Sequence, residues 1–191
     1  MNFVVAKTSS VSHEFGHRLH IFVWDVLNGT EHIRALWLYM LIAGGHFFEH
    51  LVQIGQVYLL GWAPRDAGGV LGMWFPGLAA NEVLHMSYNS FQLTGLILLW
   101  PGFRHTRRAK IWWQIAIVAQ IWHFLEHVLL QVQYLTGTYL FESVRQTSLL
   151  ELFFPRVELH FVYNLLAFTP TVIALVLYLR QVKNRAATPS T

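Results

Sequence analysis

The sequence predicts an all-α integral membrane protein, a four-helix transmembrane bundle built from a tandem duplicated two-helix hairpin and preceded by an amphipathic interfacial helix. Three observations support this fold. Of the 191 residues, 54% are hydrophobic and only 12% are charged, whereas soluble domains have about 25% charged residues. Long apolar stretches recur along the chain, and the motif His-Phe-x-Glu-His lies within two of them. We therefore expect residues 1–191 to form a single membrane domain.

Four apolar segments are long enough to cross a bilayer, which takes about 20 residues of helix. We expect these spans at about 34–61, 78–101, 110–135 and 157–180. The formal net charge is only +3, but basic residues are concentrated at 104–110 and 180–185. Because Lys and Arg are enriched in cytoplasmic loops, we predict a multi-pass protein with both termini in the cytoplasm. The lipid bilayer, and not nucleic acid, is the expected partner of this positive charge.

Residues 12–28 precede the first predicted span and mix ionisable side chains with apolar and aromatic ones. This composition is typical of an amphipathic helix that lies in the membrane interface. His13, His17 and His20 recur at a spacing that places them on one face of such a helix, where they could bind a metal ion. Histidines in this position are more commonly solvated, so the metal site is expected elsewhere.

Two segments of the chain, 34–101 and 110–181, carry the same polar pattern and form a predicted tandem repeat. His-Phe-x-Glu-His occupies residues 46–50 and again 123–127, and Leu-His-x-x-Tyr-Asn occupies residues 84–89 and again 159–164. Each copy is expected to cross the membrane twice, so both copies have the same orientation. Their relating axis should lie along the membrane normal.

The two His-Phe-x-Glu-His motifs are the candidate site because they place ionisable groups in the middle of apolar spans. On a helix the three polar residues of one motif fall within an arc of about 100°, so all three can face the bundle interior. A charged carboxylate at the centre of a span costs roughly 2.5–3.5 kcal/mol, which a bound metal ion or cofactor would offset. The predicted metal ligands are His46, Glu49, His50, His85, His123, Glu126, His127 and His160.

Six imidazoles and two carboxylates suit two transition-metal ions, with iron first and copper, zinc or manganese as alternatives. The chain contains no cysteine, which excludes thiolate sites and iron–sulfur clusters. Glu49 and Glu126 are predicted to be equivalent: they would bridge the two ions or, if unligated, serve as catalytic proton acceptors. The groups expected around the cofactor, orienting the imidazoles, are Tyr88, Asn89, Tyr163 and Asn164.

The predicted function is a membrane-embedded oxidoreductase with a dinuclear His/Glu metal centre. It would activate oxygen towards a lipid-soluble substrate and exchange electrons with a redox partner. One alternative is a b-type haem electron-transfer protein, although haem ligation does not require a glutamate beside each histidine. Another is a metal-ion or proton transporter, although four short helices leave little room for alternating access.

His-x-x-Glu-His is also the motif of inverted zinc peptidases, in which the glutamate acts as general base. A peptidase of this kind needs one zinc ion with an open coordination position. Two equivalent copies of the motif on a symmetry axis therefore argue against peptidase activity. Polar packing between helices without any cofactor remains the structural alternative.

Overall fold

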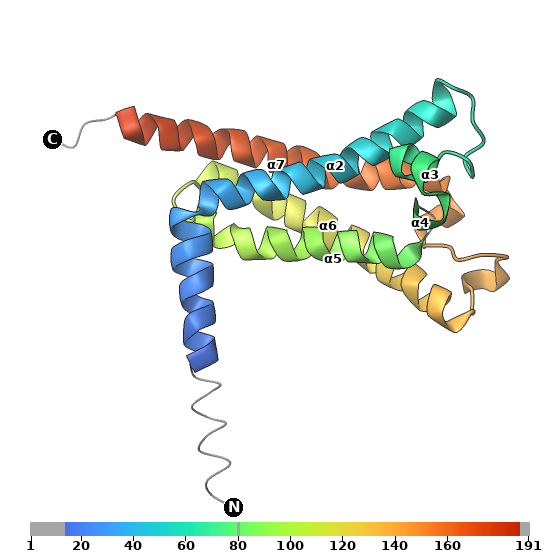
Figure 1. Ribbon diagram of the computed structural model, residues 1–191, viewed down its shortest axis with the longest axis horizontal. Helices are drawn as coiled ribbons and strands as arrows, with labels where there is room; N and C mark the ends of the chain where they lie inside the picture. The colour runs from blue at the N-terminus through green and yellow to red at the C-terminus, as the bar shows by residue number, and fades with distance from the viewer. Residues whose placement is uncertain (1–13, 80, 188–191) are drawn as a thin grey trace, which may run out of the picture.

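Four long helices lie side by side in the computed structural model, which describes residues 14–79 and 81–187 (Figure 1). They are α2 (His32–Tyr58), α5 (Glu82–Leu99), α6 (Arg107–Thr136) and α7 (Arg156–Ala187). α6 packs against α5 and α7, and α2 also packs against both α5 and α7. Each long helix therefore contacts at least two others around a common interior, and the described residues form no β-strand.

Three of these helices, α2, α6 and α7, are long and apolar enough to cross a membrane. They contain 27, 30 and 32 residues, and at about 1.5 Å per residue each exceeds the roughly 30 Å hydrocarbon core of a bilayer. Length and composition therefore indicate a membrane protein. α5 has 18 residues and falls at the predicted span 78–101, but its hydropathy is lowered by a polar stripe. The stripe consists of Glu82, His85, Asn89 and Gln92.

Residues 14–21 are helical and continue into η1 (Phe22–Thr30), which runs crosswise to the long helices (Figure 1). Asn28 anchors this segment, because its side chain donates to the Leu98 carbonyl at 2.7 Å and accepts from the Gly102 N–H at 2.9 Å. Phe15 and Phe22 are exposed. A helix is thus present where the sequence predicts one, its place in a membrane interface stays a prediction, and His13 lies outside the described residues.

An apolar core fills the interior at the end of the bundle that carries η1. Leu36, Leu96, Phe103 and Trp113 are almost completely buried there. The Trp113 indole N–H donates to the Leu96 carbonyl at 2.8 Å, which satisfies the polar atom that this ring brings into the core. The short helix η2 (Trp100–Phe103) contributes Phe103 and connects α5 to α6. This end of the bundle is therefore closed by packed side chains.

The opposite end carries two loops with short helices: α3 (Gly69–Trp74), α4 (Pro76–Ala79), η3 (Leu140–Glu142) and η4 (Leu150–Leu152). A buried glutamine fastens each loop to the helix before it. Gln56 donates to the Gly69 carbonyl at 3.3 Å and accepts from the Gly69 N–H at 2.8 Å. Gln133 donates to the Thr147 carbonyl at 2.8 Å and accepts from the Thr147 N–H at 3.3 Å. Each amide side chain thus replaces a missing backbone partner.

Glu49 also fastens the first of these loops, through hydrogen bonds to the backbone of α3. Its carboxylate accepts hydrogen bonds from the N–H groups of Val70 and Leu71, at 2.7 and 2.9 Å, in the first turn of α3. Free N–H groups at a helix N-terminus favour a negative charge. Gly69 permits this approach, because it has a φ of +72° and a Cβ atom at this position would lie 2.2 Å from Glu49 Oε2. The backbone of α3 therefore packs directly on the carboxylate.

Gly69→Ala is expected to destabilise the protein more than Gly137→Ala. Both glycines have positive φ, which costs an L residue roughly 1–2 kcal/mol, but a Cβ at Gly137 would meet nothing within 4 Å. The methyl group at position 69 would also displace Glu49 from two N–H groups, and such charge-assisted hydrogen bonds contribute about 1.5–3 kcal/mol. Thermal unfolding of the two variants in detergent measures the difference. Equal losses would contradict the packing of Glu49 on Gly69.

Candidate metal centre

The six histidines predicted as ligands meet in one cluster near the loop end of the bundle. Five are buried and His85 is half-buried. The cluster takes two rings from α2, one from α5, two from α6 and one from α7: His46, His50, His85, His123, His127 and His160. Four helices therefore contribute imidazoles to one interior site.

His160 occupies the centre of the cluster and joins the rings of the other three helices. Its ring centroid lies 5.1 Å from that of His127 and 5.8 Å from that of His123. The corresponding distances are 6.1 Å to His50 and 6.5 Å to His85. The two His-Phe-x-Glu-His motifs are thus connected through a single ring on α7.

Within each motif the two histidines point the same nitrogen at one another. His46 Nε2 lies 3.3 Å from His50 Nε2, and His123 Nε2 lies 3.1 Å from His127 Nε2. With metal–nitrogen bonds of about 2.0–2.1 Å, two imidazoles on one tetrahedral ion have nitrogens about 3.3 Å apart. Both pairs therefore have the separation of two ligands on one metal ion. In a metal-free cluster the same distance allows one neutral ring to donate to the other.

Three of the histidines lie close enough together to bind one ion. His123, His127 and His160 are buried, and one ligand nitrogen from each lies within 4.8 Å of the other two. Three imidazoles are a common protein ligand set for zinc, copper and iron. The arrangement of these three rings is therefore suitable for one metal ion.

Hydrogen bonds on the outer side of two rings fix which nitrogen is free to bind a metal. His50 Nδ1 lies 2.9 Å from Gln53 Oε1, and His160 Nδ1 lies 2.9 Å from the Arg156 carbonyl oxygen. Because these oxygens only accept, Nδ1 of each ring carries the proton and Nε2 keeps its lone pair. Metal-bound histidines usually make this outer hydrogen bond, which holds the ring in its ligating orientation.

The two glutamates of the motifs differ in their contacts, although the sequence makes them equivalent. Glu49 uses both carboxylate oxygens on the N–H groups of α3, as described above. Glu126 is 5% exposed, and neither of its carboxylate oxygens has a hydrogen-bond partner. A buried carboxylate without partners is costly as an anion. Glu126 is therefore the motif carboxylate whose oxygens are free to bind a cation.

The two predicted tyrosines contact histidine rings. Tyr88 stacks on His46, with ring centroids 4.7 Å apart and planes 11° from parallel. Tyr163 packs against His123 at 5.1 Å, and its hydroxyl accepts from the Trp122 indole N–H at 3.2 Å. Both tyrosines thus limit the rotation of an imidazole in the cluster.

The two predicted asparagines bind backbone carbonyls one turn back on their own helices. Asn89 donates to the His85 carbonyl at 3.0 Å, and Asn164 donates to the His160 carbonyl at 2.9 Å. The Asn89 side-chain oxygen also accepts from Gln120 at 2.8 Å, which links α5 to α6. The asparagines therefore support the helix turns that carry two histidines.

Glu82 is a carboxylate beside the cluster that the motifs do not reveal. It is 5% exposed, accepts a hydrogen bond from Arg156, and places Oε2 4.0 Å from His127 Nδ1. Glu82 lies three residues before His85, so the two side chains share one face of α5. This spacing is the sequence signal that could have identified Glu82 as part of the site. The ion pair with Arg156 joins residues 74 positions apart, which no local pattern predicts.

A cleft of about 750 Å³ reaches the cluster from the loop end. His50, His85 and His160 line it together with Glu82 and Arg156. The imidazoles are therefore accessible from the side of the loops, even though most of each ring is buried.

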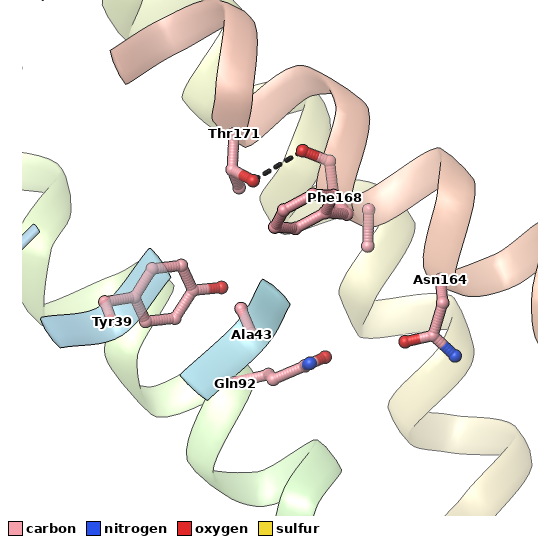
Figure 2. A pocket seen from close by; sticks show the side chains of 7 residues that line it. Tyr39, Ala43, Gln92, Asn164, Phe168 and Thr171 are labelled. Atoms are coloured by element: carbon pink, nitrogen blue, oxygen red, sulfur yellow. Dashed lines mark hydrogen bonds between the residues drawn. The ribbon is translucent and has the colours of Figure 1, made fainter. Parts of the chain in front are cut away.

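On the other side of the cluster the interior narrows to a small polar cavity of about 10 Å³, space for about one water molecule. Figure 2 shows Gln92 from α5 and Asn164 from α7 extending towards this space, with Tyr39 and the Thr171–Phe168 hydrogen bond at its edge. The apolar core around Leu36 follows beyond it. The cluster thus opens towards the loops and is closed towards η1.

Comparison of the chain with protein-family models, with curated proteins and with solved structures found no match. The function must therefore be inferred from the histidine cluster, its carboxylates and the cleft that reaches it.

His160→Ala is expected to weaken metal binding far more than His105→Ala. His160 contacts rings from all three neighbouring helices, whereas His105 is exposed in the loop before α6. Titration of metal-free protein with Co²⁺, followed by the visible absorption of the bound ion, measures the affinity. We expect a loss of more than about tenfold for His160→Ala and wild-type affinity for His105→Ala. Equal affinities would remove His160 from the metal site.

Proposed function

We propose that the chain is a membrane-embedded oxidoreductase whose histidine cluster holds a pair of transition-metal ions. One observation carries the proposal: six imidazoles from four helices meet in one buried site, with two nitrogen pairs at the separation of metal ligands. Each pair belongs to one His-Phe-x-Glu-His motif, which favours two ions over one. A redox role favours iron or copper over zinc, which has no accessible second oxidation state.

The residues around the proposed centre would each have a separate task. Bound ions would supply the electron-transfer steps. Glu126 would supply a negative charge to the ions or accept a proton, whereas Glu49 would hold the loop that lines the cleft. Tyr88 and Tyr163 would keep two imidazoles in their ligating orientations. Glu126 therefore replaces the predicted pair of bridging glutamates in the proposed mechanism.

The cleft favours a polar substrate entering from the loop side. Arg65, Asp66, Arg145 and Arg156 contribute to its lining, and three of the cluster histidines form part of its inner wall. Charged groups in a pocket orient and select polar ligands. We therefore prefer a small polar substrate to the lipid-soluble substrate that the sequence suggested.

We also infer that the fold is a four-helix transmembrane bundle produced by duplication, in which α5 crosses the membrane with α2, α6 and α7. The matching fastenings of Gln56 to Gly69 and of Gln133 to Thr147 support the duplication. The basic residues at 104–110 and 180–185 favour the cytoplasm for the η1 end and for both termini. The cleft would then open on the outer face of the membrane.

The two alternative functions fit the contacts less well. A bis-histidine haem needs two nitrogens about 4 Å apart on opposite sides of the iron, since each bond is about 2 Å long. The 3.3 and 3.1 Å nitrogen pairs each join two histidines of one helix, so neither pair can supply ligands to opposite faces of one haem. A transporter needs a continuation of the polar path, but Leu36, Phe103 and Trp113 fill the interior beyond the small cavity.

Glu126→Gln is expected to reduce bound metal about tenfold or more, whereas Glu49→Gln should retain it. The amide at position 126 removes a buried negative charge that has no hydrogen-bond partner, while the amide at position 49 weakens only the anchoring of α3. Metal per protein and ascorbate-driven oxygen uptake of the iron- or copper-loaded variants are the measurements. Both should fall in Glu126→Gln, and Glu49→Gln should show mainly a lower unfolding temperature. Equal metal losses would contradict the separate roles.

A further inference from the structure

Glu82 is buried at the outer end of α5 and has a free oxygen that faces the histidine cluster. Its Oε1 accepts from the Arg156 guanidinium at the start of α7, which stabilises the charged carboxylate. Its Oε2 is buried and has no hydrogen-bond partner. The contact with Arg156 therefore accounts for Oε1 of this carboxylate and leaves Oε2 without a partner.

His127 has the complementary unpaired atom. Its ring is 1% exposed, and Nε2 faces His123 Nε2 at 3.1 Å. Its Nδ1 is buried without a hydrogen-bond partner and lies 4.0 Å from Glu82 Oε2. An N–H donor and a carboxylate oxygen at this distance need a shift of about 1 Å to form a hydrogen bond.

The same outer position is occupied by an oxygen acceptor on two other rings of the cluster. His50 Nδ1 is bonded to Gln53 Oε1, and His160 Nδ1 is bonded to the Arg156 carbonyl. His127 belongs to the three-histidine group that could bind an ion, so it needs an equivalent partner to hold its Nε2 towards that ion. Glu82 Oε2, 4.0 Å from His127 Nδ1, is placed to be this partner.

We propose that Glu82 is a positioning residue for His127, accepting a hydrogen bond from its Nδ1–H and thereby directing its Nε2 into the metal centre. The inference rests on the proposed metal-binding function. A carboxylate in this position fixes the ring tautomer and makes the imidazole a stronger ligand. Arg156 donates to the other oxygen of Glu82, and Glu82 in turn joins the start of α7 to the cluster. The alternative is an ion pair that only joins α5 to α7.

Glu151 provides a matched control, because it is a second carboxylate partner of the same arginine. Glu151 Oε1 lies 3.4 Å from Arg156 Nε, and its other oxygen accepts from the Ser148 N–H at 3.1 Å. Glu82→Met and Glu151→Met each remove one negative charge from Arg156. Only the first removes the oxygen that faces His127.

Titration of the full-length metal-free variants with Co²⁺ tests the proposal. Glu82→Met should weaken Co²⁺ binding about tenfold to a hundredfold, and Glu151→Met should stay within about threefold of wild type. Glu82→Gln keeps an acceptor oxygen and should recover part of the loss, and it also serves as the test protein if Glu82→Met does not fold. Equal weakening by Glu82→Met and Glu151→Met, or wild-type affinity in the Glu82 variants, would overturn the positioning role.

The ¹⁵N NMR signals of His127 in metal-free protein separate this inference from the metal-binding proposal. Wild type and Glu151→Met should show a protonated, hydrogen-bonded Nδ1, whereas Glu82→Met should lose that signature. His127→Gln identifies the signals by their absence. A wild-type protein that binds no Co²⁺ but shows the bonded Nδ1 would contradict the proposed function and retain the Glu82–His127 contact. An identical His127 tautomer in wild type and Glu82→Met would overturn the inference itself.

Discussion

The enclosure of six imidazole rings between apolar helices, five of them buried and His85 half-buried, is the constraint on which the rest of the structure depends. Polar atoms in such an interior are costly unless each one finds a partner. Several ring nitrogens meet this requirement: His46 pairs with His50, and His160 bonds to the Arg156 carbonyl oxygen. Nδ1 of His123 and Nδ1 of His127 have no hydrogen-bond partner. The loops extend the same principle, since Gln56 and Gln133 fasten them through paired bonds to the backbone. The anchored loops therefore lie at the same end of the bundle as the histidine cluster, and the cleft between them reaches its rings.

Much of this arrangement follows from spacing along the sequence. Histidines four residues apart lie on one helical face, so the contact between His123 and His127 is a local consequence of α6. Apolar segments of sufficient length predicted the helices α2, α6 and α7, which are long and apolar enough to cross a membrane. The three polar residues of each His-Phe-x-Glu-His motif share one helical face, which predicts that both motifs face the bundle interior. The six-histidine cluster could therefore be predicted before any coordinates were known.

The roles of the carboxylates could not be predicted in the same way, because they depend on loops and on contacts between distant helices. Glu49 and Glu126 occupy the same motif position, yet only Glu49 meets a helix N-terminus packed on a glycine, Gly69. The second loop places Thr147 one residue further from its glutamine and carries no glycine there. Glu82 reaches Arg156 and His127 only after α5 packs against its neighbours. The periodicity of a helix contains no information about such pairs.

The content of the histidine cluster is the central claim, and the metal analysis of purified wild-type protein tests it most directly. Protein isolated in detergent and reconstituted with iron or copper should contain about two ions per chain, as expected for two histidine pairs on separate ions. Its visible spectrum should lack a Soret band. A Soret band with one haem per chain would contradict the dinuclear centre in favour of haem. Reconstituted protein that retains no metal after desalting would contradict any metal centre and leave the six imidazoles as polar packing between helices.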